Sequence, residues 1–232
     1  MQRLGGQLLC SPSDLANFVA CEHLTQLELS IALEGGRRPT VDNAYADLIQ
    51  RKGAEHEAGF LEALESAGRR VTRLGLREPP DFEAGARATA EAMCAGEEYI
   101  YQAVFLLDGW RGIADFLERV ERPSSLGPWS YEVLDTKLAR HPRPEHALQL
   151  CFYAQAVGKV QGAESEVAYV VLGTRERVPS GWRTCPPTFG ACGHDSRRPS
   201  RVGPSPCRTR VSTARCATTA PSARIAGGAR IT

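Results

Sequence analysis

Two carboxylates and one amine, separated by about the length of a hairpin, are the residues of this chain whose types and spacing could do chemistry. Asp135 and Lys137 are two residues apart in a strand-like segment, and Asp115 lies in the preceding one. Side chains two apart in a strand project from one face, and an antiparallel neighbour can bring Asp115 alongside them. Two carboxylates on one face repel each other unless a hard divalent cation neutralises them. The lysine could then orient or deprotonate a water on that cation, or stabilise charge that develops on a phosphate.

A simpler interpretation treats these three residues as solvated groups on an exposed sheet face, with an ion pair worth under ~1 kcal/mol. Other side chains favour the chemical interpretation. His56 lies on a helix that could pack over the hairpin and supply a further metal ligand, although a lone histidine is more often a boundary residue. Gln149 and Tyr153 are four apart on a later helix and share one face, which ordinary helix packing would also explain.

Apolar periodicity, caps and turn residues predict a mixed α/β fold for the first three quarters of the chain. One helix is predicted to start at the Ser-Pro-Ser-Asp of residues 11–14. Three further helices are predicted over roughly 46–67, 82–95 and 145–160. The predicted strands span roughly 99–107, 111–120, 129–138 and 166–173. The order is helix, three strands, helix, strand, preceded by additional N-terminal helices.

The composition changes at Val178. Residues 1–177 carry 19 basic and 26 acidic side chains, whereas residues 178–232 carry nine Arg, one Asp, no Lys, no Leu and no Glu. Such a segment cannot bury enough apolar surface to offset its ordering entropy. We therefore expect a folded domain over 1–177 and a disordered basic tail over 178–232. We also consider a sharper hypothesis, that the tail is a frame-shifted translation of a GC-rich gene, since the alternative frame permits a helix-forming sequence and a Cys-x2-Cys-x5-Cys spacing.

Four short motifs occur together in an order that resembles the RecB-like branch of the PD-(D/E)xK nuclease superfamily. They lie at residues 53–56, 112–115, 133–137 and 149–153, and the resemblance covers about residues 11–173. It is closest to a bacterial group of RecB-like nucleases that are often joined to helicase or ribonuclease H-like domains. The resemblance implies a restriction-endonuclease-like αβββαβ core and hydrolysis of DNA phosphodiester bonds, in DNA repair, recombination or processing.

The resemblance also implies roles for individual residues. Asp115 and Asp135 correspond to the ligands of Mg²⁺ or Mn²⁺, with His56 as an additional ligand and the Thr136 carbonyl as another. Lys137 is similar to the catalytic lysine. Gln149 and Tyr153 are similar to residues of the helix that positions nucleic acid, single-stranded or as duplex ends. Glu132 alternates to the opposite strand face from Asp135, so we interpret it as structural.

Several members of this branch hold a 4Fe–4S cluster, and Cys21 resembles the first of its four cysteine ligands. The three partners are absent from the sequence as written and occur only in the alternative frame, so Cys21 alone cannot hold a cluster. The cysteines in the tail follow no zinc spacing. No apolar run approaches ~18 residues and no secretory segment precedes the fold, so we expect a cytoplasmic protein that does not enter a membrane. The competing function classes are a non-catalytic nucleic-acid-binding module and an inactive truncated nuclease.

Overall fold

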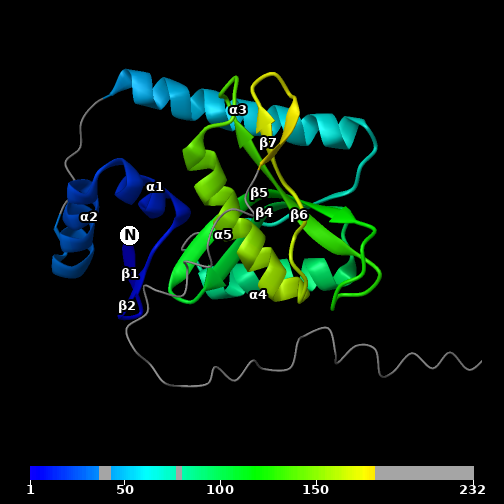
Figure 1. Ribbon diagram of the computed structural model, residues 1–232, viewed down its shortest axis with the longest axis horizontal. Helices are drawn as coiled ribbons and strands as arrows, with labels where there is room; N and C mark the ends of the chain where they lie inside the picture. Colours follow the sequence, from blue (N-terminus) through cyan, green and yellow to red (C-terminus); the bar gives the residue numbers. More distant parts are fainter. Residues whose placement is uncertain (37–42, 77–79, 181–232) are drawn as a thin grey trace, which may run out of the picture.

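The computed structural model describes residues 1–36, 43–76 and 80–180 of the chain. These residues form a mixed α/β structure built around a six-stranded sheet (Figure 1). In chain order the elements are β1 (Gln2–Leu4), β2 (Gln7–Leu9), α1 (Pro12–Ala20), α2 (Glu22–Glu34), α3 (Ala44–Ser66), β3 (Val71–Arg73), α4 (Phe82–Ala95), β4 (Tyr99–Leu107), β5 (Trp110–Val120), β6 (Ser130–Lys137), α5 (Pro144–Gln161), β7 (Ala168–Leu172) and β8 (Arg177–Ser180). Among the described residues, no helix has the length and hydrophobicity that a membrane-spanning segment needs.

The strands of the large sheet lie in the order β3-β4-β5-β6-β7-β8. β4, β5 and β6 form an antiparallel meander. α5 then returns the chain so that β7 pairs parallel to β6, which is the long crossover that a parallel pair requires. β3 adds to β4 in parallel, and β8 pairs antiparallel with β7 at the other edge. β1 and β2 form a separate two-stranded hairpin.

Helices cover both faces of this sheet. Val133 and Leu134 are neighbours in β6 but belong to different hydrophobic cores, so the two cores lie on opposite faces. The larger core includes residues of α4 and α5, and the smaller one lies under α3 and includes Leu61 and Phe116. In Figure 1, α5 crosses in front of the sheet and α3 runs along its upper side. β6 is consequently buried on both faces, and seven of its eight residues are buried.

Local sequence signals set the helix boundaries. The Asn43 side chain accepts a hydrogen bond from Ala46 N at the start of α3, and Asp81 accepts one from Ala84 N at the start of α4. At the start of α1, Asp14 accepts hydrogen bonds from Ser11 N and Ser11 Oγ, at 2.7 and 2.8 Å. These caps satisfy main-chain or side-chain donors that the first helical turn leaves without partners.

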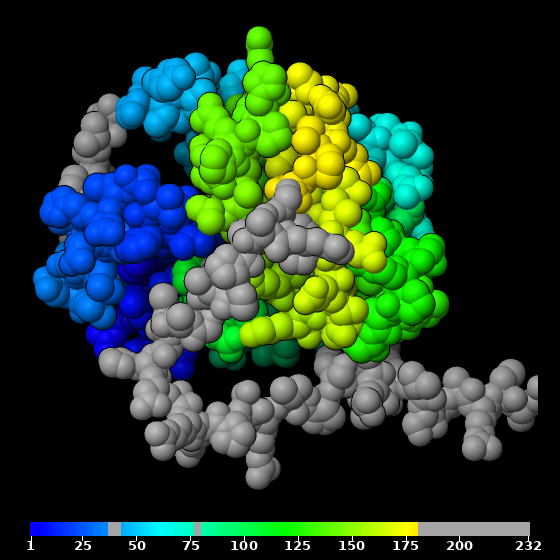
Figure 2. All heavy atoms as spheres, viewed as in Figure 1, coloured from blue at the N-terminus to red at the C-terminus, as the bar shows by residue number. Residues whose placement is uncertain are grey.

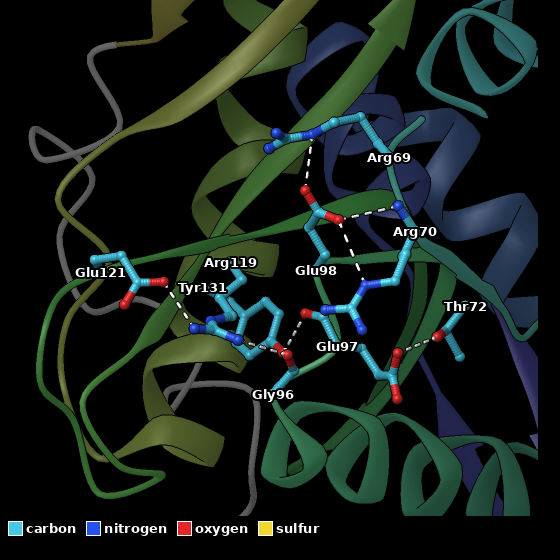
Figure 3. A network of polar contacts seen from close by, with 9 residues as sticks. All are labelled: Arg69, Arg70, Thr72, Gly96, Glu97, Glu98, Arg119, Glu121 and Tyr131. Carbon is cyan, nitrogen blue, oxygen red and sulfur yellow. Dashed lines mark hydrogen bonds and ion pairs between the residues drawn. The ribbon is translucent and has the colours of Figure 1, made fainter. Parts of the chain in front are cut away.

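A polar network fastens one end of the meander (Figure 3). Arg69 forms an ion pair with Glu98 at 2.8 Å, and the Glu98 carboxylate also accepts a hydrogen bond from Arg70 N. The Tyr131 hydroxyl donates to the Glu97 carbonyl at 2.7 Å, and Arg119 donates to the Gly96 carbonyl at 3.0 Å. The network therefore links the α3–β3 and α4–β4 turns to β5 and β6, and it lies toward the end of β6 away from Lys137.

At the other end of β6, two connections lie side by side. The segment that follows β6 and the turn between β7 and β8 meet along the upper edge of the molecule, as the lime-green and yellow atoms of Figure 2. Gly173 N donates to the Ala139 carbonyl at 3.1 Å, and a Cβ on Gly173 would come within 2.7 Å of the Leu138 carbonyl oxygen. The absence of a side chain at Gly173 is what lets these two connections approach so closely.

The structure confirms the predicted order of a helix, three strands, a helix and a strand, here α4, β4, β5, β6, α5 and β7. The predicted ranges of α4 and β4 agree with the structure, and the other predicted ends differ by a few residues. Sequence analysis did not predict β1, β2, α2, β3 or β8 as elements. β8 also extends the folded part to Ser180, three residues past the expected boundary at 177. The rest of the expected tail, with its cysteines and the residues to which the frameshift hypothesis applies, lies outside the described residues.

Candidate functional site

The candidate site lies where β5 and β6 part. Their antiparallel pairing ends at Phe116 opposite Leu134, while β6 goes on to pair with β7 as far as Lys137. The next residues along the two strands are Asp115 and Asp135, so both carboxylates lie at the opening. The Asp115 Oδ2 atom accepts hydrogen bonds from Thr136 N and from Thr136 Oγ1, both at 2.7 Å. The Asp115 side chain thus bridges a gap that main-chain pairing does not close.

A second irregularity lies on the other side of Asp115. The pairs Tyr101–Phe116 and Ala103–Ala114 flank a position at which Gln102 would face Asp115, and this one pair is missing from the β4–β5 ladder. Gln102 has φ +58°, a left-handed conformation that is uncommon for a residue with a side chain. Non-glycine residues held in such conformations occur preferentially at functional sites. Both strands are therefore irregular at the height of Asp115.

Asp135 is the most deeply buried acid of the site, with 3% of its surface exposed. Its Oδ2 atom forms an ion pair with Lys137 Nζ at 2.6 Å. Burial and the charge of Asp115 raise the pKa of Asp135 to about 7, although Lys137 opposes this rise. A buried carboxylate whose pKa is raised by burial and by a second carboxylate is typical of a functional site.

Lys137 responds to the same charges in the opposite sense. Burial alone would lower the pKa of Lys137, but the negative charges of Asp135, Asp115 and Glu57 raise it above its ordinary value. The Lys137 amine is consequently protonated at neutral pH in this arrangement. It can hold a water or stabilise negative charge on a substrate, and it is not a base. Of the three roles expected from the sequence, the positive charge of Lys137 favours orienting a water or stabilising charge on a phosphate over deprotonating water.

Glu57 is a member of this site that sequence analysis missed. Its carboxylate, on α3, accepts hydrogen bonds from the Gln102 side-chain amide and the Tyr101 hydroxyl. Burial and the charge of Asp115 raise the pKa of Glu57, and the pKa of Tyr101 rises to about 12 through burial and the nearby Glu57. The signal was present in the sequence, because Glu57 precedes Phe60 and Leu61 by one helical turn and so shares the face that packs on the sheet.

The predicted ligand His56 lies beside the site and is turned toward β7. Its Nε2 atom is 3.3 Å from the Val171 carbonyl oxygen, a contact in which Nε2 must carry the hydrogen and donate. In that tautomer Nδ1 keeps a free lone pair, which is the form a metal ligand needs. The structure records no contact of His56 with Asp115 or Asp135 among the described residues, so its role as a ligand stays a prediction.

The two residues expected on α5 differ in their surroundings. Tyr153 is buried, and burial together with the charges of Asp135 and Asp115 raises the pKa of its phenol. A Cβ on Gly112 would come within 2.8 Å of the Tyr153 ring, so glycine at this position lets α5 pack directly on β5. Gln149 is half-buried, and its side chain makes no hydrogen bond within the described part of the chain. Tyr153 is thus beside the acidic pair, and the role of Gln149 stays a prediction.

His146 is a further residue near the site that the sequence did not indicate. Its Nδ1 atom accepts a hydrogen bond from Arg143 N at 3.2 Å at the start of α5. Burial, followed by the positive charge of Lys137, lowers the pKa of His146, so the ring is neutral at physiological pH.

Glu132 forms an ion pair with Arg122 at 3.3 Å, in keeping with the structural interpretation of Glu132.

The donor set at this site suits a hard divalent cation. Asp115 and Asp135 offer carboxylate oxygens, and the buried Oδ2 of Asp135 is paired with the Lys137 ammonium. The Thr136 carbonyl stays an expected further ligand. Within the described residues, no three His, Cys, Asp or Glu side chains are placed so that all could ligate one ion. Mg²⁺ commonly uses only one or two carboxylates and keeps several waters, so two acids are sufficient. The residues therefore fit Mg²⁺ or Mn²⁺. The Lys137 ammonium partly balances the negative charge of the two carboxylates.

The cysteines follow a different pattern. Cys21 joins α1 to α2 as an exposed free thiol, and its expected cluster partners lie outside the described residues. Cys94 and Cys151 lie in α4 and α5, pack in the large core and are disulfide-bonded. The described residues therefore offer Cys21 no companion ligands for an iron–sulfur cluster.

Comparison with known proteins adds no family. No protein-family model matches the chain, and no curated protein is similar enough to it to count as a match.

Proposed function

We propose that this chain is a metal-dependent nuclease that hydrolyses DNA phosphodiester bonds, with a restriction-endonuclease-like core of the RecB-like PD-(D/E)xK kind. The observation that carries the proposal is the meeting of Asp115 and Lys137 with the buried Asp135 where β5 and β6 part. The order α4, β4, β5, β6, α5 and β7 supports the proposed core. Participation in DNA repair or recombination, and association with a helicase or ribonuclease H-like domain, belong to the same proposal.

The energetic cost of burying Asp135 favours a functional role for this residue over a structural one. Keeping a carboxylate buried beside a second carboxylate costs stability, and a fold gains nothing from it that an apolar residue would not supply. Groups whose pKa values are strongly perturbed by burial and by a specific charge gather at active sites. Asp135 is such a group, because it is only 3% exposed and the charge of Asp115 adds to the effect of burial on its pKa.

Each residue has a defined part in the proposed reaction. A bound Mg²⁺ or Mn²⁺ would supply Lewis acidity to the scissile phosphate and activate water as the nucleophile. Asp115 and Asp135 would hold the ion, with Thr136 fixing the orientation of Asp115 through its two hydrogen bonds. Lys137, protonated between these carboxylates, would orient the attacking water and stabilise the negative charge of the pentacoordinate transition state at phosphorus.

The edge beyond Lys137 suits a phosphate backbone. Arg140 follows β6 and Arg175 follows β7, in the two adjacent connections joined by Gly173 and Ala139. Both arginines are exposed, and neither guanidinium has an ion-pair partner within the described residues. Most other arginines of the fold are paired with Glu. Unpaired cations next to a phosphodiesterase site are where a DNA strand would gain electrostatic attraction.

A cleavage assay tests the proposal. The full-length chain would be incubated with labelled single-stranded and duplex DNA in Mg²⁺, in Mn²⁺ and in EDTA. We expect metal-dependent cleavage that Asp115→Asn and Asp135→Asn abolish. Asp108→Asn is the matched control, because Asp108 is an exposed turn residue with φ +48°, which asparagine adopts readily.

The outcomes separate the competing functions. Wild-type activity in Asp135→Asn would refute the assignment of the site. Salt-sensitive DNA binding without cleavage, at any metal concentration, would instead support a non-catalytic nucleic-acid-binding module. A chain that neither cleaves nor binds DNA would support an inactive truncated nuclease.

A further inference from the structure

We propose that Cys94 and Cys151 form one disulfide bond that joins α4 to α5, and that exchange of this bond with small thiols moves the protein between a more stable and a less stable folded form. The four cysteines of the described residues fall into two pairs. Cys10 and Cys21 carry thiols, whereas Cys94 and Cys151 are both disulfide-bonded. Only the effect of this bond on DNA cleavage rests on the proposed function.

The surroundings of the two bonded cysteines favour a bond between them. A disulfide requires two Cα atoms about 4.4–6.8 Å apart, so its cysteines must come from segments that pack together. Cys94 and Cys151 lie on helices that cover the same face of the sheet, and both side chains pack in the larger hydrophobic core. Within the described part of the chain, no other cysteine is disulfide-bonded. One bond from α4 to α5 therefore accounts for both.

Such a bond closes a loop that contains the whole candidate site. Cys94 and Cys151 are 57 positions apart along the chain, and β4, β5 and β6 all lie between them. The loop consequently includes Asp115, Asp135 and Lys137. A disulfide stabilises a fold mainly by restricting the unfolded chain, and the effect grows with the length of the loop. The segment that carries the site is thus the segment that the bond protects from unfolding.

Cys151 also directly precedes the residues that seat α5 on the sheet. A Cβ on Gly112 in β5 would come within 2.7 Å of the Phe152 ring and within 2.8 Å of the Tyr153 ring. These contacts leave α5 no room to move toward the sheet, and a bond from Cys151 to α4 would prevent it from moving away. The disulfide therefore holds α5 in place over the strand that carries Asp115.

The two sulfur atoms differ in their access to solvent. Cys94 is half-buried, whereas Cys151 is 1% exposed. The thiolate of a small thiol such as glutathione would attack the Cys94 sulfur and break the disulfide, and the electron pair of that bond leaves with the Cys151 sulfur, which takes up a proton. A second thiolate attacks the mixed disulfide, releases the Cys94 thiol and forms oxidised glutathione. Two small thiols are oxidised for each protein disulfide reduced, and oxidised glutathione reverses the exchange.

Reduction leaves the core in place. A cysteine thiol packs as a small apolar residue, and the neighbours Leu150, Phe152 and Ala154 are all buried whether or not the bond is present. The reduced protein therefore keeps its fold and loses the constraint on the loop. For a loop of this length in a chain of this size, we expect the melting temperature to fall by about 10 °C on reduction.

Peptide mapping tests the pairing. The full-length protein is purified without reductant, alkylated and digested with trypsin under non-reducing conditions. We expect the tryptic peptides 88–111 and 141–159 to be linked to each other, and dithiothreitol to separate them. Alkylation of Cys94 or Cys151 before reduction, or a link from either to any other cysteine, overturns the proposal.

Thermal unfolding tests the change in stability. Wild type, Cys94→Ala and Cys21→Ala are melted with and without dithiothreitol. We expect dithiothreitol to lower the melting temperature of wild type by about 10 °C, and that of Cys21→Ala equally, because Cys21 is an exposed thiol outside the bond. Cys94→Ala should match reduced wild type in both conditions. Oxidised glutathione, added to wild type after dithiothreitol is removed, should restore the higher melting temperature.

A melting temperature of wild type that dithiothreitol leaves unchanged, or that oxidised glutathione does not restore, overturns the proposal. Reduced wild type carries no substitution, so this comparison stands even if Cys94→Ala does not fold.

Cleavage is compared at a temperature between the two melting temperatures of wild type, where only the oxidised protein should cut DNA. Equal cleavage by the oxidised and reduced forms there overturns the link between the bond and the site. A protein that shows both melting temperatures but cuts DNA in neither form, at any temperature, refutes the proposed function and leaves the disulfide proposal standing.

Discussion

Replacing Asp135 by Asn should stabilise the metal-free protein, by an amount that depends on pH. The folded protein raises the pKa of Asp135 from its ordinary 3.8 to about 7, first through burial and then through Asp115. Between these two pH values the folded state keeps a proton that the unfolded chain releases. The contribution of Asp135 to stability is therefore greatest at low pH, and it falls as the pH rises from about 4 to about 7.

The size of the effect follows from the same values. One pKa unit corresponds to about 1.4 kcal/mol, so a rise of about three units makes ionised Asp135 cost about 4 kcal/mol in the folded state. Asn has nearly the same shape and no charge, but it leaves Lys137 without its closest partner. Allowing for that loss, we expect Asp135→Asn to stabilise the metal-free protein by ~2 kcal/mol above neutral pH.

Urea unfolding in EDTA, followed by tryptophan fluorescence from about pH 4 to about pH 8, measures this difference. The free energy of unfolding of Asp135→Asn minus that of wild type should be near its minimum at the acid end and should increase toward neutral pH. Asp108→Asn serves as the control and should show no such increase, because Asp108 is exposed. A difference that does not change with pH, or an Asn variant that is less stable than wild type above neutral pH, would refute the reasoning.

Three other changes test other parts of the structure. Gly112→Ala should destabilise the protein by about 1–3 kcal/mol in thermal unfolding, because the added methyl would come within 2.7 Å of a ring on α5; an unchanged melting temperature would contradict this packing. Arg140→Ala and Arg175→Ala should each weaken DNA binding about equally for all sequences and reduce the salt slope by about 1 in anisotropy titrations. Arg3→Ala, on the separate hairpin, should leave that slope unchanged. Lys137→Ala should abolish cleavage and raise the pKa of Asp135 further, measured by NMR titration of its carboxyl carbon; a lower pKa would show that the lysine does not offset the acids.

Strands and helices that carry their own signals were predicted from the sequence. Apolar patterns and turn residues predicted β4, β5 and α4, and the structure shows Asp81 and Gly96 as the two caps of α4. The elements that were missed depend on partners. β3 and β8 are three and four residues long and exist through pairing with β4 and β7. α2 has no buried residue, so it offers no apolar face from which a sequence pattern could identify it.

The candidate site shows the same division. Asp115, Asp135 and Lys137 could be predicted, because strand alternation and hairpin connection are local properties. The left-handed conformation of Gln102 could not, because nothing in its own neighbourhood in sequence requires it. That conformation coincides with a hydrogen bond to Glu57, 45 residues earlier in the chain. Tertiary contacts of this kind decide how far His56 turns toward Val171 as well, and a single sequence does not reveal them.

The change of partner along β6 has a consequence for how the protein folds. Connections of two and nine residues join β4 to β5 and β5 to β6, whereas Val133 and its parallel partner Ala168 are 35 residues apart along the chain. Contacts between nearby segments form first, because distant ones must overcome a larger loop-closure entropy. The meander would thus assemble early. Asp135 would be buried late, when β7 pairs with β6 after the main kinetic barrier. A mutation that relieves its buried charge should then act by slowing unfolding, with little effect on the rate of folding.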